Sequence, residues 1–254
     1  MRAKRLLRRA LYRMLQGTHV LPSVWMLGNP FKIWEYQAVM AGVSLEPYHE
    51  VLDLGCGRGF QTQVLARKCR RVVGLDISPA QIAGAREFLR GSPVERRVEF
   101  VCSRLEDAGF PDARFDRILS FCVLEHIPNL NVVLAEIARI LKPRGELHVS
   151  VDALATIRDP LLIEKHRAEH HVVQYFTPHS LEQQLRGAGL DVMEIAPLLT
   201  GEFARRQFEK RILAGRYGCP MHRKVGFVHR LAVEDQKRCE GDGIMLIGRA
   251  RRPT

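Results

Sequence analysis

Seven short apolar runs recur along the chain, and turn-rich or helical segments separate them. The first four are VLDL (51–54), RVVGL (71–75), RVEFVC (97–102) and FDRILSFC (115–122). Three more lie at residues 145–151, 190–199 and 243–251. Apolar runs of this length between turn residues are typical of buried strands. The pattern predicts an α/β protein with seven strands.

Helical patterns fill the intervals between these runs, at residues 31–42, 60–68, 79–90, 129–141 and 177–186. Two of the helices have a clear start signal, because Ser78-Pro79 and Thr177-Pro178 each place a hydroxyl before a proline. The hydroxyl accepts a hydrogen bond from a free amide, and proline is tolerated at the first helical position. Residues 17–30 hold two glycines and two prolines and are predicted to form a linker.

Positive charge is concentrated in two segments outside the predicted strands. Residues 2–16 alternate arginine with an apolar stripe, which predicts a basic amphipathic helix. Residues 201–241 are also basic and are predicted to be helical. The formal net charge is +11, which is compatible with nucleic acid, anionic lipid or an acidic substrate. The six cysteines form no C-x-x-C pair, so they indicate reduced thiols and a cytoplasmic protein.

The most informative stretch is the glycine turn that follows the first apolar run. Asp53 ends that run, and Gly55, Gly57 and Gly59 follow at alternating positions. Dinucleotide-binding enzymes need G-x-G-x-x-G for a pyrophosphate, whereas an acidic residue here repels phosphate and attracts an ammonium group. Asp76 ends the second run and is placed to hold a ribose diol. A ligand with a cationic amino-acid end and a ribose fits both carboxylates.

Four segments in this order resemble the class I S-adenosylmethionine-dependent methyltransferases, in the small-molecule branch called type 11. They are DLGCGRG, GLDIS, RFDRILSFCVLEHI and RILKPRGELHVSV. The resemblance implies a Rossmann-like, mostly parallel sheet of seven strands, with the last strand antiparallel and helices on both faces. It also implies an N-terminal helical extension and lid (1–46), a cofactor-binding core (47–151), a cap insertion (152–176), and a C-terminal part (177–254) that contains the basic insertion.

The same resemblance implies a set of residues that contact S-adenosylmethionine. The set comprises Asp53, Gly55, Cys56, Gly57, Gly59, Asp76, Ile77, Ser103, Leu105 and Phe121. The family usually has an acidic residue facing the adenine amine where this chain has Arg104. Because arginine cannot accept a hydrogen bond, adenine recognition is expected to fall to the backbone near Ser103 and Leu105, with Ile77 and Leu105 flanking the ring. Trp34 and Tyr36 are candidates for the lid, and Trp34 is expected to be core.

The reacting methyl group is expected near the end of the fourth run. His126 is a candidate general base for a hydroxyl acceptor, and the alternative is that it hydrogen-bonds a neighbouring loop. Cys122 is expected to line the cleft rather than act as a nucleophile. The LEH segment resembles part of the metal-binding segment of quinone-biosynthesis O-methyltransferases, but Cys122 stands in place of one glutamate. The HRAEHH segment lacks a third zinc ligand, so no metal is predicted.

We therefore expect an S-adenosylmethionine-dependent methyltransferase that acts on a small-molecule or lipid-like acceptor, more readily at oxygen than at carbon or nitrogen. An RNA methyltransferase and a cofactor-binding module without transfer activity remain alternatives. The arginine-rich segments suggest peripheral contact with an anionic membrane as a further hypothesis. RNA ranks lower, because no RNA-binding module is visible.

Overall fold

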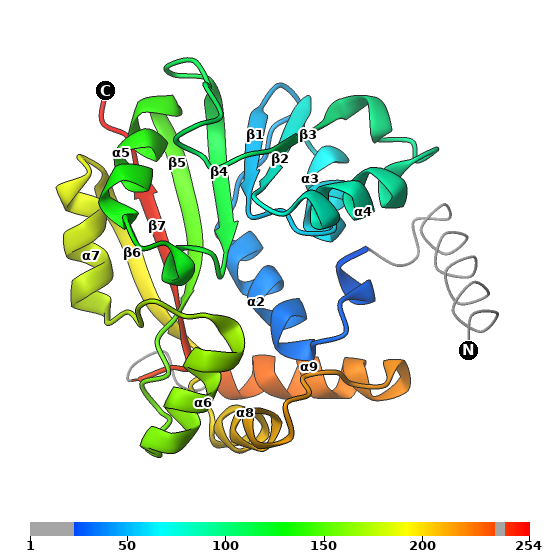
Figure 1. The fold of residues 1–254 in the computed structure, drawn as a ribbon, viewed down its shortest axis with the longest axis vertical. Coiled ribbons are helices and arrows are strands. Elements are labelled where there is room, and N and C mark those ends of the chain that lie inside the picture. The colour runs from blue at the N-terminus through cyan, green and yellow to red at the C-terminus, as the bar shows by residue number, and fades with distance from the viewer. Residues whose placement is uncertain (1–22, 237–241) are drawn as a thin grey trace.

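A seven-stranded sheet forms the centre of the protein (Figure 1), with strand order β3-β2-β1-β4-β5-β7-β6. The structure is a computed structural model that describes residues 23–236 and 242–254. The strands are β1 (Glu50–Leu54), β2 (Arg71–Asp76), β3 (Val98–Cys102), β4 (Phe115–Phe121), β5 (Leu141–Asp152), β6 (Asp191–Leu198) and β7 (Met245–Arg251). Only β7 runs antiparallel to its neighbours, β5 and β6. The predicted sheet, including its antiparallel last strand, is confirmed.

The strand order reverses between β1 and β4, which lie side by side in register, with Leu54 opposite Ser120. From β1 the chain moves outward to β2 and β3, and from β4 it moves outward in the other direction. The loops that leave the carboxyl ends of β1 and β4 therefore diverge and leave room between them. Ligands of open α/β sheets bind at this point.

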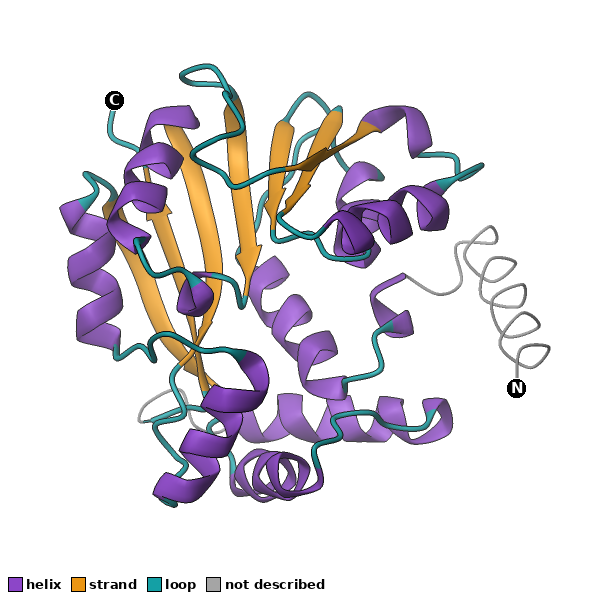
Figure 2. Ribbon diagram, viewed as in Figure 1, coloured by secondary structure: helices purple, strands orange, loops and turns teal. Residues whose placement is uncertain are grey.

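Helices cover both faces of the sheet (Figure 2). One face carries α2 (Pro30–Ala41), α3 (Phe60–Ala66) and α4 (Pro79–Leu89), and the other carries α5 (Leu130–Ile140) and α7 (Pro178–Gly187). Because successive strand residues point to opposite faces, β1 contributes Leu52 and Leu54 to one apolar cluster and Val51 to the other. This double burial explains why the strands are almost continuously apolar.

The two predicted helix starts are confirmed. Ser78 Oγ accepts a hydrogen bond from Gln81 N at 3.4 Å, and Pro79 is the first residue of α4. Thr177 Oγ1 accepts from Ser180 N at 3.1 Å, while Ser180 Oγ accepts from Thr177 N, which forms a reciprocal capping box. Serine at the third position of this box does what glutamate or glutamine usually does.

The fifth strand begins earlier than predicted, because the turn at residues 142–145 is built into β5 as an irregularity. Arg144, which stands where the family usually has glycine, adopts a left-handed backbone with φ of 62°. Gly145 is the second of the two glycines that the family usually has in this turn. A Cβ there would lie 2.9 Å from Lys142 O and 3.1 Å from Phe115 O, so the close approach of the strands requires glycine.

The basic insertion forms two helices, α8 (Glu202–Ala214) and α9 (Met221–Gln236), and α9 packs against α2. Lys224 of α9 is fully buried, and its Nζ donates to Trp25 O and Leu27 O in and after the short helix η1 (Ser23–Met26). Asp235 Oδ2 accepts from Trp34 Nε1 at 2.6 Å. Trp34 is thus half-buried and hydrogen-bonded, and η1 interrupts the predicted linker. The predicted basic helix at residues 2–16 lies outside the described residues.

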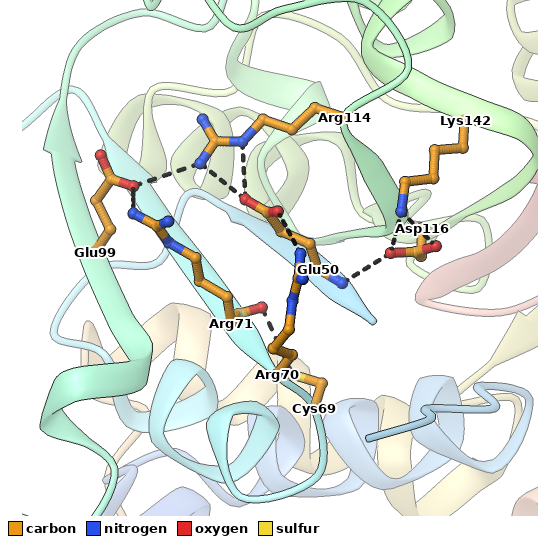
Figure 3. Close-up of polar contacts among 8 residues, drawn as sticks. All are labelled: Glu50, Cys69, Arg70, Arg71, Glu99, Arg114, Asp116 and Lys142. Carbon is orange, nitrogen blue, oxygen red and sulfur yellow. Dashed lines mark hydrogen bonds and ion pairs between the residues drawn. The ribbon is translucent and has the colours of Figure 1, made fainter. Parts of the chain in front are cut away.

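A charged network joins the amino-terminal ends of five strands, β1 to β5, at the end of the sheet opposite the glycine turn (Figure 3). Glu50 accepts from Arg114 Nε at 2.8 Å, and Glu50 N donates to Asp116 Oδ2 at 2.8 Å. Glu99 pairs with Arg71 at 2.8 Å and Arg114 at 3.4 Å, while Lys142 donates to Asp116. These pairs fix the strand starts, and their carboxylates neutralise part of the local arginine charge.

Two further segments lie between the sheet and the insertion. The cap region contains α6 (Pro160–His170), and β4 is followed by a short turn of 3₁₀ helix, η3 (Leu124–His126). A further such turn, η2 (Glu95–Arg97), precedes β3.

Within the described residues, we find no helix that combines the length and apolarity needed to cross a membrane.

Candidate functional site

The glycine turn after β1 has a backbone that side-chain-bearing residues rarely adopt. Gly55, Gly57 and Gly59 have φ values of 75°, 51° and 74°. Gly55 N and Cys56 N both donate to Leu75 O of β2, at 2.8 and 3.0 Å. A Cβ at Gly55 would overlap Val123 Cγ2, whereas a Cβ at Gly57 would meet no atom within 4 Å. The turn is therefore packed at Gly55 and open at Gly57, where a ligand can approach the backbone.

Asp76 holds this turn from the neighbouring strand. Its Oδ2 accepts from Gly57 N at 2.9 Å, and its Oδ1 accepts from Ser78 N at 2.9 Å. Each oxygen keeps a second lone pair for a ligand hydroxyl, and the side chain is half-buried. The carboxylate thus links the glycine turn to the start of α4.

Asp53 lies deeper, with 1% of its surface exposed, and accepts from Thr62 Oγ1 at 2.5 Å. Burial raises the pKa of Asp53 to about 7, although the Thr62 hydrogen bond opposes this shift. A cationic group brought to the turn would favour the ionised carboxylate. Sequence reasoning identified Asp53 but could not identify Thr62 as its partner.

The residues expected around an adenine ring lie at the ends of β2 and β3. Ile77 is 73% exposed, which is unusual for a large apolar side chain beside a folded core and leaves it free to cover a ring. Leu105 is buried, and Ser103 is half-buried with its amide donating to Asp76 O at 3.2 Å. Arg104, which stands where the family usually has an acidic residue, donates from Nε to Glu106 Oε1 at 2.8 Å. The Glu106 carboxylate therefore neutralises the positive charge of Arg104, and sequence reasoning missed this pairing.

Phe121 and Cys56 complete the predicted ligand set, and both side chains are buried. The Phe121 ring packs against Tyr36 of α2, with ring centroids 5.6 Å apart. Cys56 Sγ lies 3.8 Å from Gly57 O. The predicted lid residue Tyr36 therefore reaches the end of β4, near the glycine turn.

Cys122 follows β4 in a left-handed conformation, with φ of 51°, which is uncommon for a residue other than glycine. Its amide donates to Ser150 O at 3.0 Å and its thiol to Glu35 Oε1 at 3.2 Å. Burial and the charge of Glu35 raise the pKa of the thiol, so Cys122 stays protonated at neutral pH. A protonated thiol is a poor nucleophile, which agrees with the predicted lining role.

A cluster of polar side chains, all buried except the half-buried Lys32, surrounds the half-buried Cys122, and we call it the acceptor-side cluster. Its members besides Cys122 are Lys32, Glu35, Glu125, Ser150, Asp152 and His166. Ser150 Oγ donates to Glu35 Oε1 at 2.5 Å, and Lys32 Nζ lies 3.0 Å from Glu35 Oε2. Asp152 Oδ2 lies 3.8 Å from His166 Nε2. The cluster could not be predicted from the sequence, because its members come from α2, η3, β5 and α6, which are far apart along the chain.

Within the described part of the chain, three potential metal-ligand atoms converge only at Cys122, Glu125 and Asp152, within 4.8 Å of one another. The H-x-x-E-H pattern does not assemble, because Glu169 pairs with Lys165 at 2.6 Å, while His166 faces Asp152. Cys219 and His222 belong to no such group among these residues.

His126, the predicted general base, is half-exposed in η3. Its Nδ1 lies 3.3 Å from His171 O, at the end of α6. This contact corresponds to the alternative in which the histidine hydrogen-bonds a neighbouring loop, and it leaves Nε2 for another partner. The geometry is compatible with either role.

Comparison with known proteins identifies the same central segment. Residues 52–149 match the methyltransferase domain family. Ubiquinone biosynthesis O-methyltransferase of Rhodopseudomonas palustris (strain BisB5) is 30% identical over 164 residues, which cover 61% of this chain and 64% of the relative. Methyltransferase GfsG of Streptomyces halstedii is 32% identical over 157 residues, 58% of this chain and 54% of the relative. The chain thus matches less than two thirds of the length of either protein.

Among solved structures, the [4+2]-cyclase SpnF has a TM-score of 0.66 and 22% identity, covering 88% of this chain and 82% of the other. A geranyl diphosphate C-methyltransferase from Streptomyces coelicolor A3(2) has a TM-score of 0.62 and 15% identity, covering 85% of this chain and 77% of the other. At these identities the similarity concerns the fold alone.

Proposed function

Because this chain belongs to the class I S-adenosylmethionine-dependent methyltransferases, in the type 11 branch, we propose that it methylates a small-molecule or lipid-like acceptor at an oxygen atom. The observation that carries the proposal is the open glycine turn held between two acidic strand ends. Asp53 lies on one side of it, and Asp76 accepts from Gly57 N on the other. Oxygen is favoured because relatives matched over this segment are named O-methyltransferases.

The residues present fit S-adenosylmethionine. The backbone at Gly57 is open, Asp53 offers a buried negative charge to the amino-acid end, and Asp76 has lone pairs for a ribose diol. Ile77 and Leu105 would flank the adenine. When bound, the cofactor supplies a methyl group on a sulfonium, which carries its own leaving group. The protein therefore contributes mainly proximity, orientation and exclusion of water.

Cofactor binding should be coupled to proton release, because Asp53 holds a proton in the free protein below pH of about 7. An incoming ammonium group favours the ionised carboxylate, so binding at about pH 6 should release up to about one proton per ligand. Release should fall as pH rises above about 7, where Asp53 is already ionised. Calorimetry in buffers of different ionisation enthalpy measures this number. Asp53→Asn should abolish it, and equal release by this variant would assign the proton to another group.

His126 remains a proposed general base, since its Nε2 makes no hydrogen bond among the described residues. His126→Ala should lower turnover about 10²-fold and spare cofactor affinity, because general-base catalysis typically contributes about 10²–10⁴-fold. The loss should shrink for acceptors that are already ionised. An unchanged pH–rate profile would leave His126 with only its contact to His171.

The function is tested by incubating the protein with methyl-labelled S-adenosylmethionine and separated lipid, small-molecule and RNA fractions of a cell extract. We expect label in the lipid or small-molecule fraction. Label confined to RNA would support the alternative RNA methyltransferase. Binding of the cofactor with no transfer to any fraction would support a binding module, an alternative that matters because the fold is shared with a cyclase.

Contact with an anionic membrane is a second proposal, and it concerns the partner rather than the reaction. Several basic side chains of the insertion already have partners within the protein. Arg205 and Arg206 pair with Glu202, and Lys224 is buried. However, α8 and α9 also expose Leu213 and Val225, at 67% and 64%. Exposed apolar groups beside basic ones favour binding to anionic lipid.

Liposome co-sedimentation tests this proposal. Binding should require anionic lipid, weaken with salt, and fall when Arg5, Arg8 and Arg9 are changed to glutamate, each contributing about 1 kcal/mol near the surface. Protein that stays in the supernatant with anionic vesicles at low salt would contradict it.

A further inference from the structure

The acceptor-side cluster has more hydrogen-bond acceptors than donors. Glu125 is fully buried, and neither of its carboxyl oxygens has a hydrogen-bond partner among the described residues. Burial and the charge of Asp152 raise the pKa of Glu125 to about 8, so the group is largely protonated at neutral pH and ionises when a cation comes close. Its backbone oxygen accepts from Val173 N at 2.9 Å and Gln174 N at 3.2 Å, so the residue is held in place. Leaving a buried polar group unpaired costs about 1–3 kcal/mol, more for a charged one. A buried, fixed and unpaired carboxyl group therefore needs an explanation.

A second pair of polar atoms without a close contact to each other involves a different element, α6. Tyr175 OH lies 3.3 Å from Ile163 O and 3.0 Å from His166 Nδ1. Burial lowers the pKa of His166 to about 4, so the ring is neutral at neutral pH and carries its one proton on either nitrogen. His166 Nε2 lies 3.8 Å from Asp152 Oδ2, which is too long for a direct hydrogen bond, so both atoms can also bind a ligand.

The donors of the cluster do not fill this deficit. Ser150 Oγ donates its single proton to Glu35, and the Cys122 thiol also lies nearest Glu35, at 3.2 Å against 3.7 Å for Asp152 Oδ1. Lys32 is ion-paired with Glu35. Glu35 therefore takes the closest donors, Asp152 keeps only the longer thiol contact, and the carboxyl oxygens of Glu125 have no hydrogen-bond partner among the described residues.

We propose that Glu125, Asp152 and His166 form the subsite that binds the methyl acceptor, and that they recognise it by its hydroxyl hydrogen-bond donors. The inference rests on the proposed function, since Glu125 follows β4, Asp152 ends β5 and His166 faces Asp152 from α6, at the carboxyl ends of the strands where the methyl group would be delivered. Two hydroxyl groups close together would satisfy one Glu125 oxygen and the Asp152–His166 pair at once.

The same residues disfavour an amine acceptor. Glu35, Asp152 and Glu125, which an incoming cation would ionise, stabilise a protonated ammonium group, whose nitrogen has no lone pair to attack a methyl carbon. A hydroxyl keeps its lone pairs while it donates to a carboxylate. During transfer its O–H bond breaks, and that electron pair stays on oxygen as the O–CH₃ bond forms. The C–S electron pair goes to sulfur, and the proton goes to the ionised form of Glu125, which then returns it to solvent.

Glu125→Gln is the informative variant, because it keeps the shape of the side chain and replaces an acceptor with an amide donor. Transfer of labelled methyl into the accepting extract fraction should fall about 10- to 100-fold, as expected when a substrate hydroxyl loses its charged partner. Cofactor affinity should stay within about twofold of the native value, because the glycine turn is untouched. The melting temperature should not fall, since the change exchanges one unpaired buried polar group for another of the same shape.

Glu146→Gln is the matched control. Glu146 is also a buried glutamate and lies on β5, but it pairs with Arg251 at 2.9 Å and His148 at 3.1 Å at the other end of the strand. This variant should transfer methyl at the native rate. In a parallel arm, reductive methylation of the extract fraction blocks primary and secondary amines and leaves hydroxyls intact, so the fraction should remain a good acceptor.

Three results would overturn the subsite. They are full activity of Glu125→Gln, a melting temperature that falls together with activity, and an amine-blocked fraction that no longer accepts methyl. Loss of transfer in EDTA, with recovery on adding Mg²⁺ or Zn²⁺, would also overturn it, because the ion would then occupy these acceptor atoms. If the native protein transfers methyl to no fraction, the proposed function itself fails and the subsite falls with it.

Discussion

Gly57→Ala is expected to weaken S-adenosylmethionine binding by at least about 100-fold while the protein stays folded. The new Cβ would meet no protein atom within 4 Å, so it would project into the space that the ligand needs. The left-handed backbone, with φ of 51°, adds a strain of about 1–2 kcal/mol for alanine. Strain alone would reduce stability, whereas the projecting methyl group should remove binding.

Gly91→Ala separates these two effects. Gly91 also has a left-handed backbone, with φ of 71°, and a Cβ there would also meet nothing within 4 Å. It follows α4, and a Cβ there would contact no residue of the glycine turn. Calorimetry should give native affinity for Gly91→Ala at a similar loss of melting temperature. Near-native affinity for Gly57→Ala would contradict the placement of the ligand over this turn.

Asp76→Asn should weaken cofactor binding by about 1.5–3 kcal/mol, the value of a hydrogen bond to a charged group. The substitution places an amide nitrogen where one oxygen now accepts from Gly57 N or Ser78 N, so it also loosens the turn. A ligand that lacks the 2′-hydroxyl distinguishes direct contact from loosening. The native protein should discriminate against this ligand, and the variant should discriminate less.

Asp116→Asn is the control for this experiment. Asp116 also accepts from a strand amide, Glu50 N, but it lies at the opposite edge of the sheet (Figure 3). Its replacement should leave cofactor affinity unchanged. Equal discrimination by native protein and Asp76→Asn would show that the diol is held by another residue.

The sheet could be predicted from sequence because its strands are buried on both faces and leave long apolar runs. The helix starts at Ser78 and Thr177 could also be predicted, since a local hydrogen bond determines each. The start of β5 could not be predicted as well. Arg144 in a left-handed conformation is a strained choice that no local rule favours, and the packing around Gly145 determines it.

The site was predictable only where it is local in sequence. Asp53 and Asp76 lie at the ends of two consecutive strands and the glycines directly follow the first, so the spacing reveals them. Glu35 and Asp152 converge on Cys122 from α2 and β5, and only the folded chain brings them together. The pairing of Arg104 with Glu106 spans two residues, yet the sequence alone did not show which way either side chain points.

Methyl-deuterated S-adenosylmethionine provides the most direct test of the proposed reaction. The native protein is incubated with this cofactor and the accepting extract fraction, and the product is isolated and examined by mass spectrometry and NMR. We predict one deuterated methyl group on an oxygen atom of a small or lipid-like molecule, absent when Gly57→Ala replaces the native protein. A native protein that binds the cofactor tightly but leaves the deuterated methyl group on it would contradict the assignment.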